Sequence, residues 1–142
     1  MRLVVQTNVS GKLLLWLVQK DKTLVFISET VTWHGSDKAL VLVNKLLRQN
    51  KHTVHDIQEI LVVCGPGSFT AVRTGLIIAN TLGQLLTIPV EGIVSEQELT
   101  ERDIVRHHFG KKSLGVLVKP YYGKAPNITK AKPKKFQAKA IL

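Results

Sequence analysis

The sequence has few of the residues from which a covalent or metal-based framework is built. Its 142 residues include a single cysteine, Cys64, so the chain cannot form an internal disulfide. His52 and His55 lie three residues apart, but no cysteine or carboxylate completes a zinc-binding set at a suggestive spacing. The acidic residues are scattered, without a pair placed for general acid and base chemistry. We therefore expect no metal, no cofactor and no catalytic residue.

Long apolar runs are also missing. The longest uncharged stretch, residues 74–90, is interrupted by Asn80, Gly83, Gln84 and Pro89. It falls short of the roughly 20 apolar residues that cross a bilayer. The N-terminus has no charged segment followed by a long apolar stretch, as a secretory signal would. These absences predict a cytoplasmic chain without a membrane span.

Acidic residues are absent from the last part of the chain. The formal net charge is +10, and residues 110–142 contribute nine lysines and no Asp or Glu. Residues 1–109 nearly balance 11 basic against 10 acidic side chains. This division predicts a neutral body over 1–109 and a lysine-rich C-terminal segment over 110–142 that is partly extended or disordered. With 44% apolar residues, the body can bury one core.

The body contains short apolar runs that alternate with helical patterns. Runs at 2–7, 12–19 and 23–30, separated by turn residues, predict an antiparallel meander. A helical period follows and predicts a helix from Ser36 or Asp37 to about Asn50. Beyond it we expect a strand at 59–64, a helix at 68–86, a strand at 89–94 and a helix at 96–108. This order predicts an α/β fold with a mixed five-stranded sheet.

A glycine-rich turn joins the strand 59–64 to the helix that follows, and it consists of Gly65, Pro66, Gly67, Ser68, Phe69 and Thr70. A turn of this kind can hold an anion on its backbone amides. A P-loop would end in a Lys-Ser or Lys-Thr pair, whereas the nearest cation here is Arg73. Ser68 fits an N-cap better than a nucleophile, and Cys64 fits a small core residue. The turn therefore does not predict nucleotide hydrolysis.

The two longer helices carry more apolar surface than one sheet face covers. The apolar residues of the helix 68–86 span an arc of roughly 200° at 100° per residue. Ala71 and Gly75 give that arc a shallow flank, and Val41 and Leu42 widen the stripe of the first helix. Either the two helices pack on each other as well as on the sheet, or they bind another protein.

Four segments together resemble a known family. The run from Gly65 to Gly75 (GPGSFTAVRTG) is similar to the Gly-Pro-Gly-Ser-Phe-Thr-Gly-x-Arg-x-Gly signature of the bacterial TsaB (YeaZ-like) proteins. The helix start His34-x-x-Asp37-x-x-Leu40 resembles that family's His-x-Glu-x-Leu segment. Residues 88–95 and 120–126 resemble further family segments, the second a Pro-x-Tyr-x-Arg-x-Pro motif. The resemblance covers nearly the whole chain.

The resemblance implies one lobe of the actin/Hsp70/sugar-kinase (ribonuclease H-like) fold. It also implies a role in making N6-threonylcarbamoyladenosine on tRNA, as a non-catalytic scaffold subunit. The implied partners are a TsaD-like transferase subunit bound through the two helices, a TsaE-like ATPase, tRNA held by the complex, and a second copy of the chain bound through the same helices. The partner interface implied in this way contains His34, Asp37, Leu40, Val41, Ala71, Arg73, Gly75, Ile78 and Leu82.

Two features depart from the family pattern. The first strand ends in Gln6-Thr7-Asn8, where the family has Asp-Thr-Ser, so the carboxylate that a related ATPase would use is missing. Between Ser95 and Pro120 the chain is too short for a second subdomain, which suggests a one-lobe form.

An alternative hypothesis is a stand-alone RNA-binding module that acts through its basic tail. Lys130, Lys132, Lys134 and Lys135 could neutralise phosphates through counterion release, or they could simply form a solvated tail. Aromatic residues are few in this segment, so we expect contact with the RNA backbone rather than base stacking. A peptidase ranks last, because neither a metal triad nor a nucleophile is evident.

Overall fold

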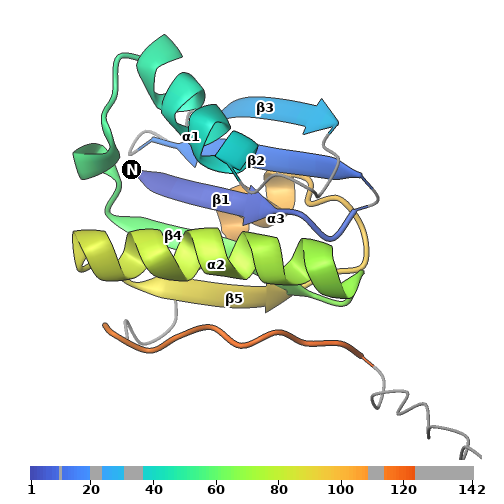
Figure 1. Ribbon diagram of the computed structural model, residues 1–142. Helices are drawn as coiled ribbons and strands as arrows, with labels where there is room; N and C mark the ends of the chain where they lie inside the picture. Colours follow the sequence, from blue (N-terminus) through green and yellow to red (C-terminus); the bar gives the residue numbers. More distant parts are fainter. Residues whose placement is uncertain (10, 20–23, 31–36, 109–113, 124–142) are drawn as a thin grey trace, which may run out of the picture.

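A mixed five-stranded sheet forms the centre of the computed structural model (Figure 1), which describes residues 1–9, 11–19, 24–30, 37–108 and 114–123. The order of strands across the sheet is β3 (Leu24–Thr30), β2 (Lys12–Val18), β1 (Arg2–Gln6), β4 (Glu59–Gly65) and β5 (Val90–Val94). The first three strands pair antiparallel, as the predicted meander requires, and β1, β4 and β5 pair parallel. The predicted mixed five-stranded α/β fold is confirmed.

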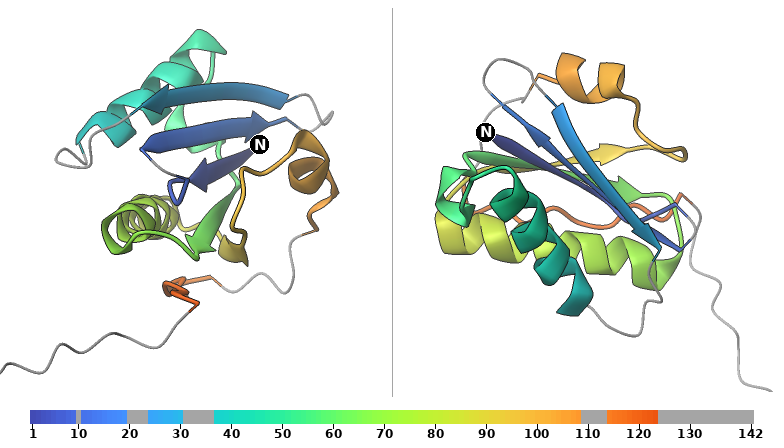
Figure 2. Two further views of the ribbon diagram at one scale, coloured as in Figure 1. Left: turned by 90° about the vertical axis from the view of Figure 1, so that its right-hand side faces the viewer. Right: turned by 90° about the horizontal axis from the view of Figure 1, so that it is seen from above.

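Helices cover the two faces of the sheet unequally. The long helices α1 (Asp37–Gln49) and α2 (Phe69–Leu86) lie on one face, and the short helix α3 (Glu101–Arg106) lies on the other (Figures 1 and 2). A single 3₁₀ turn, η1 (Val54–Asp56), precedes β4. Side chains alternate along a strand, so Leu3 joins the large cluster under α1 and α2, while Val4 joins the smaller cluster around Ile104 of α3.

The last helix is shorter than the sequence pattern predicts. We expected a helix over 96–108, but α3 begins at Glu101 because Thr100 is its N-cap. The Thr100 hydroxyl accepts a hydrogen bond from the Asp103 amide at 3.2 Å, and the Asp103 carboxylate accepts one from the Thr100 amide at 2.9 Å. This reciprocal pair satisfies two amides that would otherwise lack partners and fixes the start of the helix.

Part of the predicted C-terminal segment packs against the body. Residues 114–123, which we call the strap, run past α2 and β5 in an extended conformation (Figure 1). The Asn80 side chain of α2 both donates to the Val118 carbonyl and accepts from the Val118 amide, each at 3.0 Å. The Tyr121 amide donates to the Cys64 carbonyl at 2.7 Å. The strap is therefore fixed to α2 and to the end of β4.

Within the described residues, no helix has the length and apolar character needed to cross a membrane.

Candidate functional site

The glycine turn is filled by groups of the chain itself. Gly65 has a φ of 130°, and a Cβ atom there would collide with the Tyr121 carbonyl of the strap. A Cβ on Gly67 would lie 2.7 Å from Cβ of Asn8. Both positions need glycine because other backbone segments approach them so closely. The turn is thus the junction at which β1, β4 and the strap meet.

Gln6, at the end of β1, binds backbone rather than a ligand. This fully buried side chain donates to the Gln97 carbonyl at 2.8 Å and to the Asn8 side chain at 3.0 Å. Its oxygen accepts from the Leu99 amide at 2.9 Å. An amide can make these contacts because it carries both donors and an acceptor, which a carboxylate does not. Gln6 therefore anchors the segment that leads into α3.

The next two residues have the same kind of role. Asn8 donates to the carbonyls of Pro66 at 2.8 Å and Ser95 at 2.6 Å, so it ties the glycine turn to the end of β5. The Thr7 hydroxyl donates to the Ala71 carbonyl in the first turn of α2 at 2.8 Å. Gln6 and Asn8, which depart from the family's Asp-Thr-Ser, and Thr7, which does not, thus all hold backbone segments together.

The two residues with potential nucleophiles have structural roles. The Ser68 hydroxyl accepts from the Ala71 amide at 3.3 Å, which confirms the predicted N-cap of α2. Cys64 is buried and its thiol donates to the Ile93 carbonyl at 3.2 Å. Burial raises the pKa of the Cys64 thiol, because the thiolate would lose its hydration. Cys64 is thus the core residue that the sequence predicts.

No group of three metal-ligating side chains occurs among the described residues. His52 lies 3.8 Å from the Asp56 carboxylate, and the partly buried His107 lies 3.4 Å from Glu91. Hydrogen bonds from Thr53 lower the pKa of Asp56, and those from Thr100 likewise lower the pKa of Asp103. These pairs join neighbouring elements of the fold.

Four of the residues predicted at the partner interface are buried in the chain's own core. Ala71, Gly75, Ile78 and Leu82 all lie on the sheet side of α2. A Cβ on Gly75 would collide with the hydroxyl of Thr7, which directly follows β1. The small residues thus allow α2 to approach its own sheet, which corrects the prediction that they present a surface to a partner.

The remaining described interface residues are exposed, and two unpredicted residues join them. Leu40 and Val41 of α1 are 51% and 65% exposed, and Arg73 of α2 is also exposed. Ile77 and Leu85 of α2 are 61% and 75% exposed, although the sequence analysis did not assign them to the interface. We call Leu40, Val41, Ile77 and Leu85 the two-helix face. Helical projection could have shown that Ile77 faces away from the sheet, because it lies about 200° around the helix from Gly75.

Several predicted residues cannot be placed. His34 and the lysines 130, 132, 134 and 135 lie outside the described residues. Asp37 is the first residue of α1, but its side chain is not described, and Ser36, the other predicted N-cap, lies outside the described residues.

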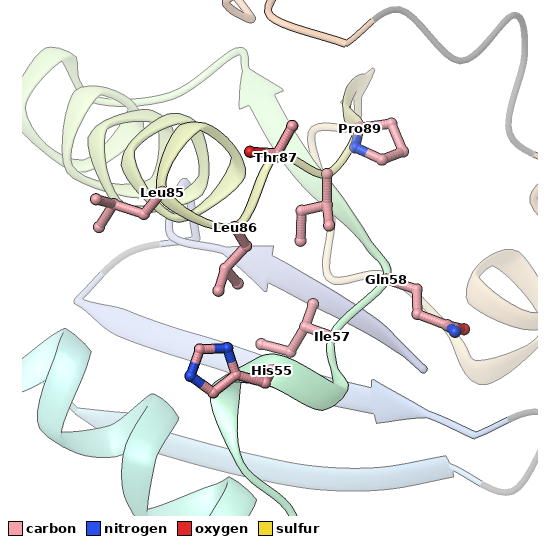
Figure 3. A pocket seen from close by; sticks show the side chains of 8 residues that line it. His55, Ile57, Gln58, Leu85, Leu86, Thr87 and Pro89 are labelled. Carbon is pink, nitrogen blue, oxygen red and sulfur yellow. The ribbon is translucent and has the colours of Figure 1, made fainter.

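An open pocket of about 450 Å³ lies at the C-terminal end of α2 (Figure 3). The side chains of Leu86, Ile57 and His55 gather around it, and Thr87 closes the helix in the left-handed conformation with a φ of 54°. His55 is the only titratable side chain in its lining, so the pocket offers no acid–base pair.

The chain is similar in sequence to known proteins. Residues 28–113 match the family model described as TsaD: tRNA N6-adenosine threonylcarbamoyltransferase. A relative from Buchnera aphidicola subsp. Schizaphis graminum is 32% identical over 60% of this chain and 40% of its own length. A relative from Bacillus subtilis is 36% identical over 51% of this chain and 33% of its own length. Both are named tRNA threonylcarbamoyladenosine biosynthesis protein TsaB, and the chain spans well under half the length of either.

Solved structures share the fold. YeaZ from Pseudomonas aeruginosa superimposes on 66% of this chain and 44% of its own, with a TM-score of 0.60 at 22% identity. A second structure, titled an uncharacterized protein with similarity to peptidase YEAZ from the same organism, gives 0.61 at 22% identity, over 66% of this chain and 42% of its own. These matches confirm the predicted α/β lobe. Because the family model covers more than half of the residues, this chain belongs to the TsaD family, and within that family it is a TsaB/YeaZ-like protein.

Proposed function

We propose that this chain is a non-catalytic scaffold subunit in the formation of N6-threonylcarbamoyladenosine on tRNA. It pairs with a TsaD-like transferase subunit through the two-helix face, and this role implies the cytoplasm. The names of the Buchnera and Bacillus relatives support the pathway. A TsaE-like ATPase would join the assembled complex, and a second copy of the chain would compete for the same face.

The observation that carries the proposal is the exposed apolar surface of α1 and α2. Both helices pack on the same core cluster, so their outer surfaces lie on the same side of the molecule (Figure 2). Leu40, Val41, Ile77 and Leu85 are each more than half exposed there. Burying apolar surface of this kind contributes about 25 cal/mol per Å² before the cost of association is subtracted. In the isolated chain these four side chains are exposed to solvent, so this free energy of burial is not gained.

The non-catalytic part of the proposal is supported by the uses of the polar side chains. Gln6 and Asn8 are engaged with backbone carbonyls at the end of β1, and Gln6 takes the place of the one carboxylate that a related ATPase would use. Ser68 caps a helix, and burial keeps the Cys64 thiol neutral. We expect the purified chain to neither hydrolyse ATP nor modify tRNA, whereas an activity that follows the protein through a final purification column would contradict this.

The pairing is tested with Val41→Asp and Leu85→Asp, one on each helix. Each variant should weaken binding to the TsaD-like subunit of the same organism by tenfold or more, because a carboxylate would be desolvated in an apolar contact. Calorimetry would measure the affinity, and sedimentation with and without the transferase subunit would separate pairing from self-association. Val94→Asp is the matched control, since Val94 is 57% exposed but lies on β5.

The proposal requires that pairing is lost without loss of folding. Thermal unfolding of the Val41 and Leu85 variants should match that of the unmodified chain, because both side chains are already in solvent. If the unmodified chain binds the transferase subunit and both variants bind it equally well, the two-helix face is not the interface.

A further inference from the structure

Docking of the strap places Tyr122 beside Phe69 and Arg73, two residues of α2 that are far from it in the sequence. Phe69, in the first turn of α2, stacks with Tyr122 of the strap, with ring centroids 5.5 Å apart and an angle of 19° between the rings. The Arg73 guanidinium lies 4.8 Å from the centre of the Phe69 ring. We call Phe69, Arg73 and Tyr122 the aromatic cluster. Phe69 is 57% and Tyr122 is 39% exposed, so the cluster is open to solvent.

A pocket of about 300 Å³ adjoins the aromatic cluster. Besides the three residues of the cluster, its lining consists of Leu76, Ile77, Asn80, Val118 and Pro120. This volume is at the small end of the range for ligand pockets. The lining therefore combines flat rings and aliphatic groups with one guanidinium.

The two elements that line the pocket contain no acidic residues. The sequences of α2 and the strap contain no Asp or Glu, and the strap adds the exposed Lys119. Arg73 forms no ion pair with any described residue. The sequence from residue 110 onward has nine lysines and no acidic residue, so the chain that follows the cluster is also basic. A ligand with negative charge is therefore favoured over a neutral or basic one.

A ligand that fits these groups needs a flat π surface and an adjacent negative charge. Nucleotides of single-stranded RNA have both, because their unpaired bases stack on aromatic side chains and their phosphates bind cations. Arginine suits this site, since its planar guanidinium can bind a phosphate and stack on a ring. The bases of a duplex are already stacked on one another, so double-stranded RNA would bind the site only through its phosphates.

We propose that the aromatic cluster is a contact site for single-stranded RNA, in which an unpaired base stacks on the Tyr122–Phe69 pair and a neighbouring phosphate binds Arg73. Ile77 of the two-helix face also lines the pocket, so this site borders the proposed pairing surface at one end. Leu85, at the far end of α2, is separated from Phe69 by about 24 Å of helix. RNA binding by the isolated chain therefore tests this site, and transferase binding without RNA tests the pairing.

The aromatic contribution is tested with Tyr122→Leu and Phe69→Leu, which retain apolar bulk but remove the rings. Fluorescence anisotropy with a labelled single-stranded oligoadenylate should show about tenfold weaker binding for each variant. Because stacking releases no counterions, the slope of log affinity against log salt should stay unchanged. Phe26→Leu is the matched control: Phe26 is 49% exposed and also packs on another ring, that of Trp16, but it lies on β3.

The ionic contribution is tested with Arg73→Gln against Arg48→Gln. Arg48 is an exposed arginine in the last turn of α1, away from the aromatic cluster. Arg73→Gln should weaken binding severalfold and lower the salt slope by about 0.7, the value for one phosphate of a single strand. Arg48→Gln should change the affinity by less than a factor of about two.

The lysine-rich tail gives an internal comparison. Truncation after Ile128 removes five lysines, among them Lys130, Lys132, Lys134 and Lys135. The truncated chain should show a flatter salt slope, while Tyr122→Leu should still weaken its binding by about tenfold. A double-stranded RNA should bind the unmodified chain and Tyr122→Leu equally.

Several outcomes would overturn the proposal. It fails if the chain binds no oligoadenylate, or if both ring variants bind as well as the unmodified chain. It also fails if the ring variants lose only transferase binding, because the cluster is then a protein contact. Phe69 lies next to the N-cap of α2, so if Phe69→Leu unfolds, Tyr122→Leu and Arg73→Gln decide the question.

Discussion

The two sides of helix α2 both carry apolar residues, but glycines occur only on the side toward the sheet. The side toward the sheet has small residues at the points of closest approach, such as Gly75 against Thr7 and Gly83 against Val90. The side toward solvent has Phe69, Ile77 and Leu85, all more than half exposed. Small residues thus mark the contact that is already made inside the chain. Large apolar residues mark the surface that is still open to another molecule.

Substitution of Gly75 should have the largest effect on the stability of the chain. A small effect would mean that Gly75 does not mark a close contact between α2 and the sheet. Even a Cβ atom collides with the Thr7 hydroxyl, so Gly75→Val should lower the free energy of unfolding by about 3 kcal/mol or more. Gly75→Trp should therefore disrupt the fold. It should not leave a folded chain that has lost only its binding to a partner. Chemical denaturation measures the effect.

A double substitution checks the cause of that loss. Gly75→Ala should destabilise the chain much less in a Thr7→Ala background, because the colliding hydroxyl is then absent. Gln84→Ala, on the exposed side of the same helix, should change the stability by less than about 0.5 kcal/mol. Equal costs for Gly75→Ala with and without the Thr7 hydroxyl would show that the close approach is not the reason.

Asn80 lies between the two sides of α2, where it holds the strap. Asn80→Ala removes both hydrogen bonds to Val118 and should cost about 1–3 kcal/mol. The strap should then be cut by a protease near Tyr121 under conditions in which the unmodified chain resists. Unchanged cleavage would mean that the other strap contacts hold it without Asn80.

Cys64 lies beneath the strap, so the rate at which its thiol is alkylated reports how well this region is covered. Its raised pKa leaves less thiolate than a free cysteine has at pH 8, so alkylation should be slow there and should accelerate as the pH rises. Asn80→Ala should speed the reaction at every pH if the strap covers the thiol. A rate equal to that of free cysteine in the unmodified chain would contradict the burial of Cys64.

The smallest effect is expected from shortening the apolar surface that is exposed. Leu85→Gln should change the free energy of unfolding by less than about 0.5 kcal/mol, because Leu85 is 75% exposed in the isolated chain. With the transferase subunit present, the same substitution should reduce the thermal stabilisation that pairing confers. A large loss of stability in the isolated chain would place Leu85 in the core and remove it from the two-helix face.

Much of the fold could be predicted because it depends on local patterns. The meander, the strand before Gly65 and the N-cap at Ser68 follow from periodicity and from turn and cap chemistry. The predicted start of the last helix, at residue 96, is wrong because the prediction continues the helix on the N-terminal side of Thr100. The Thr100–Asp103 pair was a visible sign of a helix start.

The candidate site was less predictable because its contacts are not periodic. Helical projection showed that Ala71 and Gly75 form a shallow flank, but it could not tell whether the chain's own sheet or a partner fills that flank. The Asn80 contacts with the Val118 backbone depend on no pattern in the strap sequence. The aromatic cluster forms only when the strap docks on α2, so no sequence pattern indicates that Phe69 and Tyr122 meet.

The bond between the Tyr121 amide and the Cys64 carbonyl has a consequence for how the protein is made. All five strands have been synthesised by Val94, yet the carbonyl at the end of β4 receives this donor only when Tyr121 has also been added. At roughly 5–20 residues per second, a ribosome needs roughly 1–5 s to pass from Val94 to Tyr121. During that interval all five strands have been synthesised, but the end of β4 and the glycine turn still lack the contacts that Tyr121 makes with them.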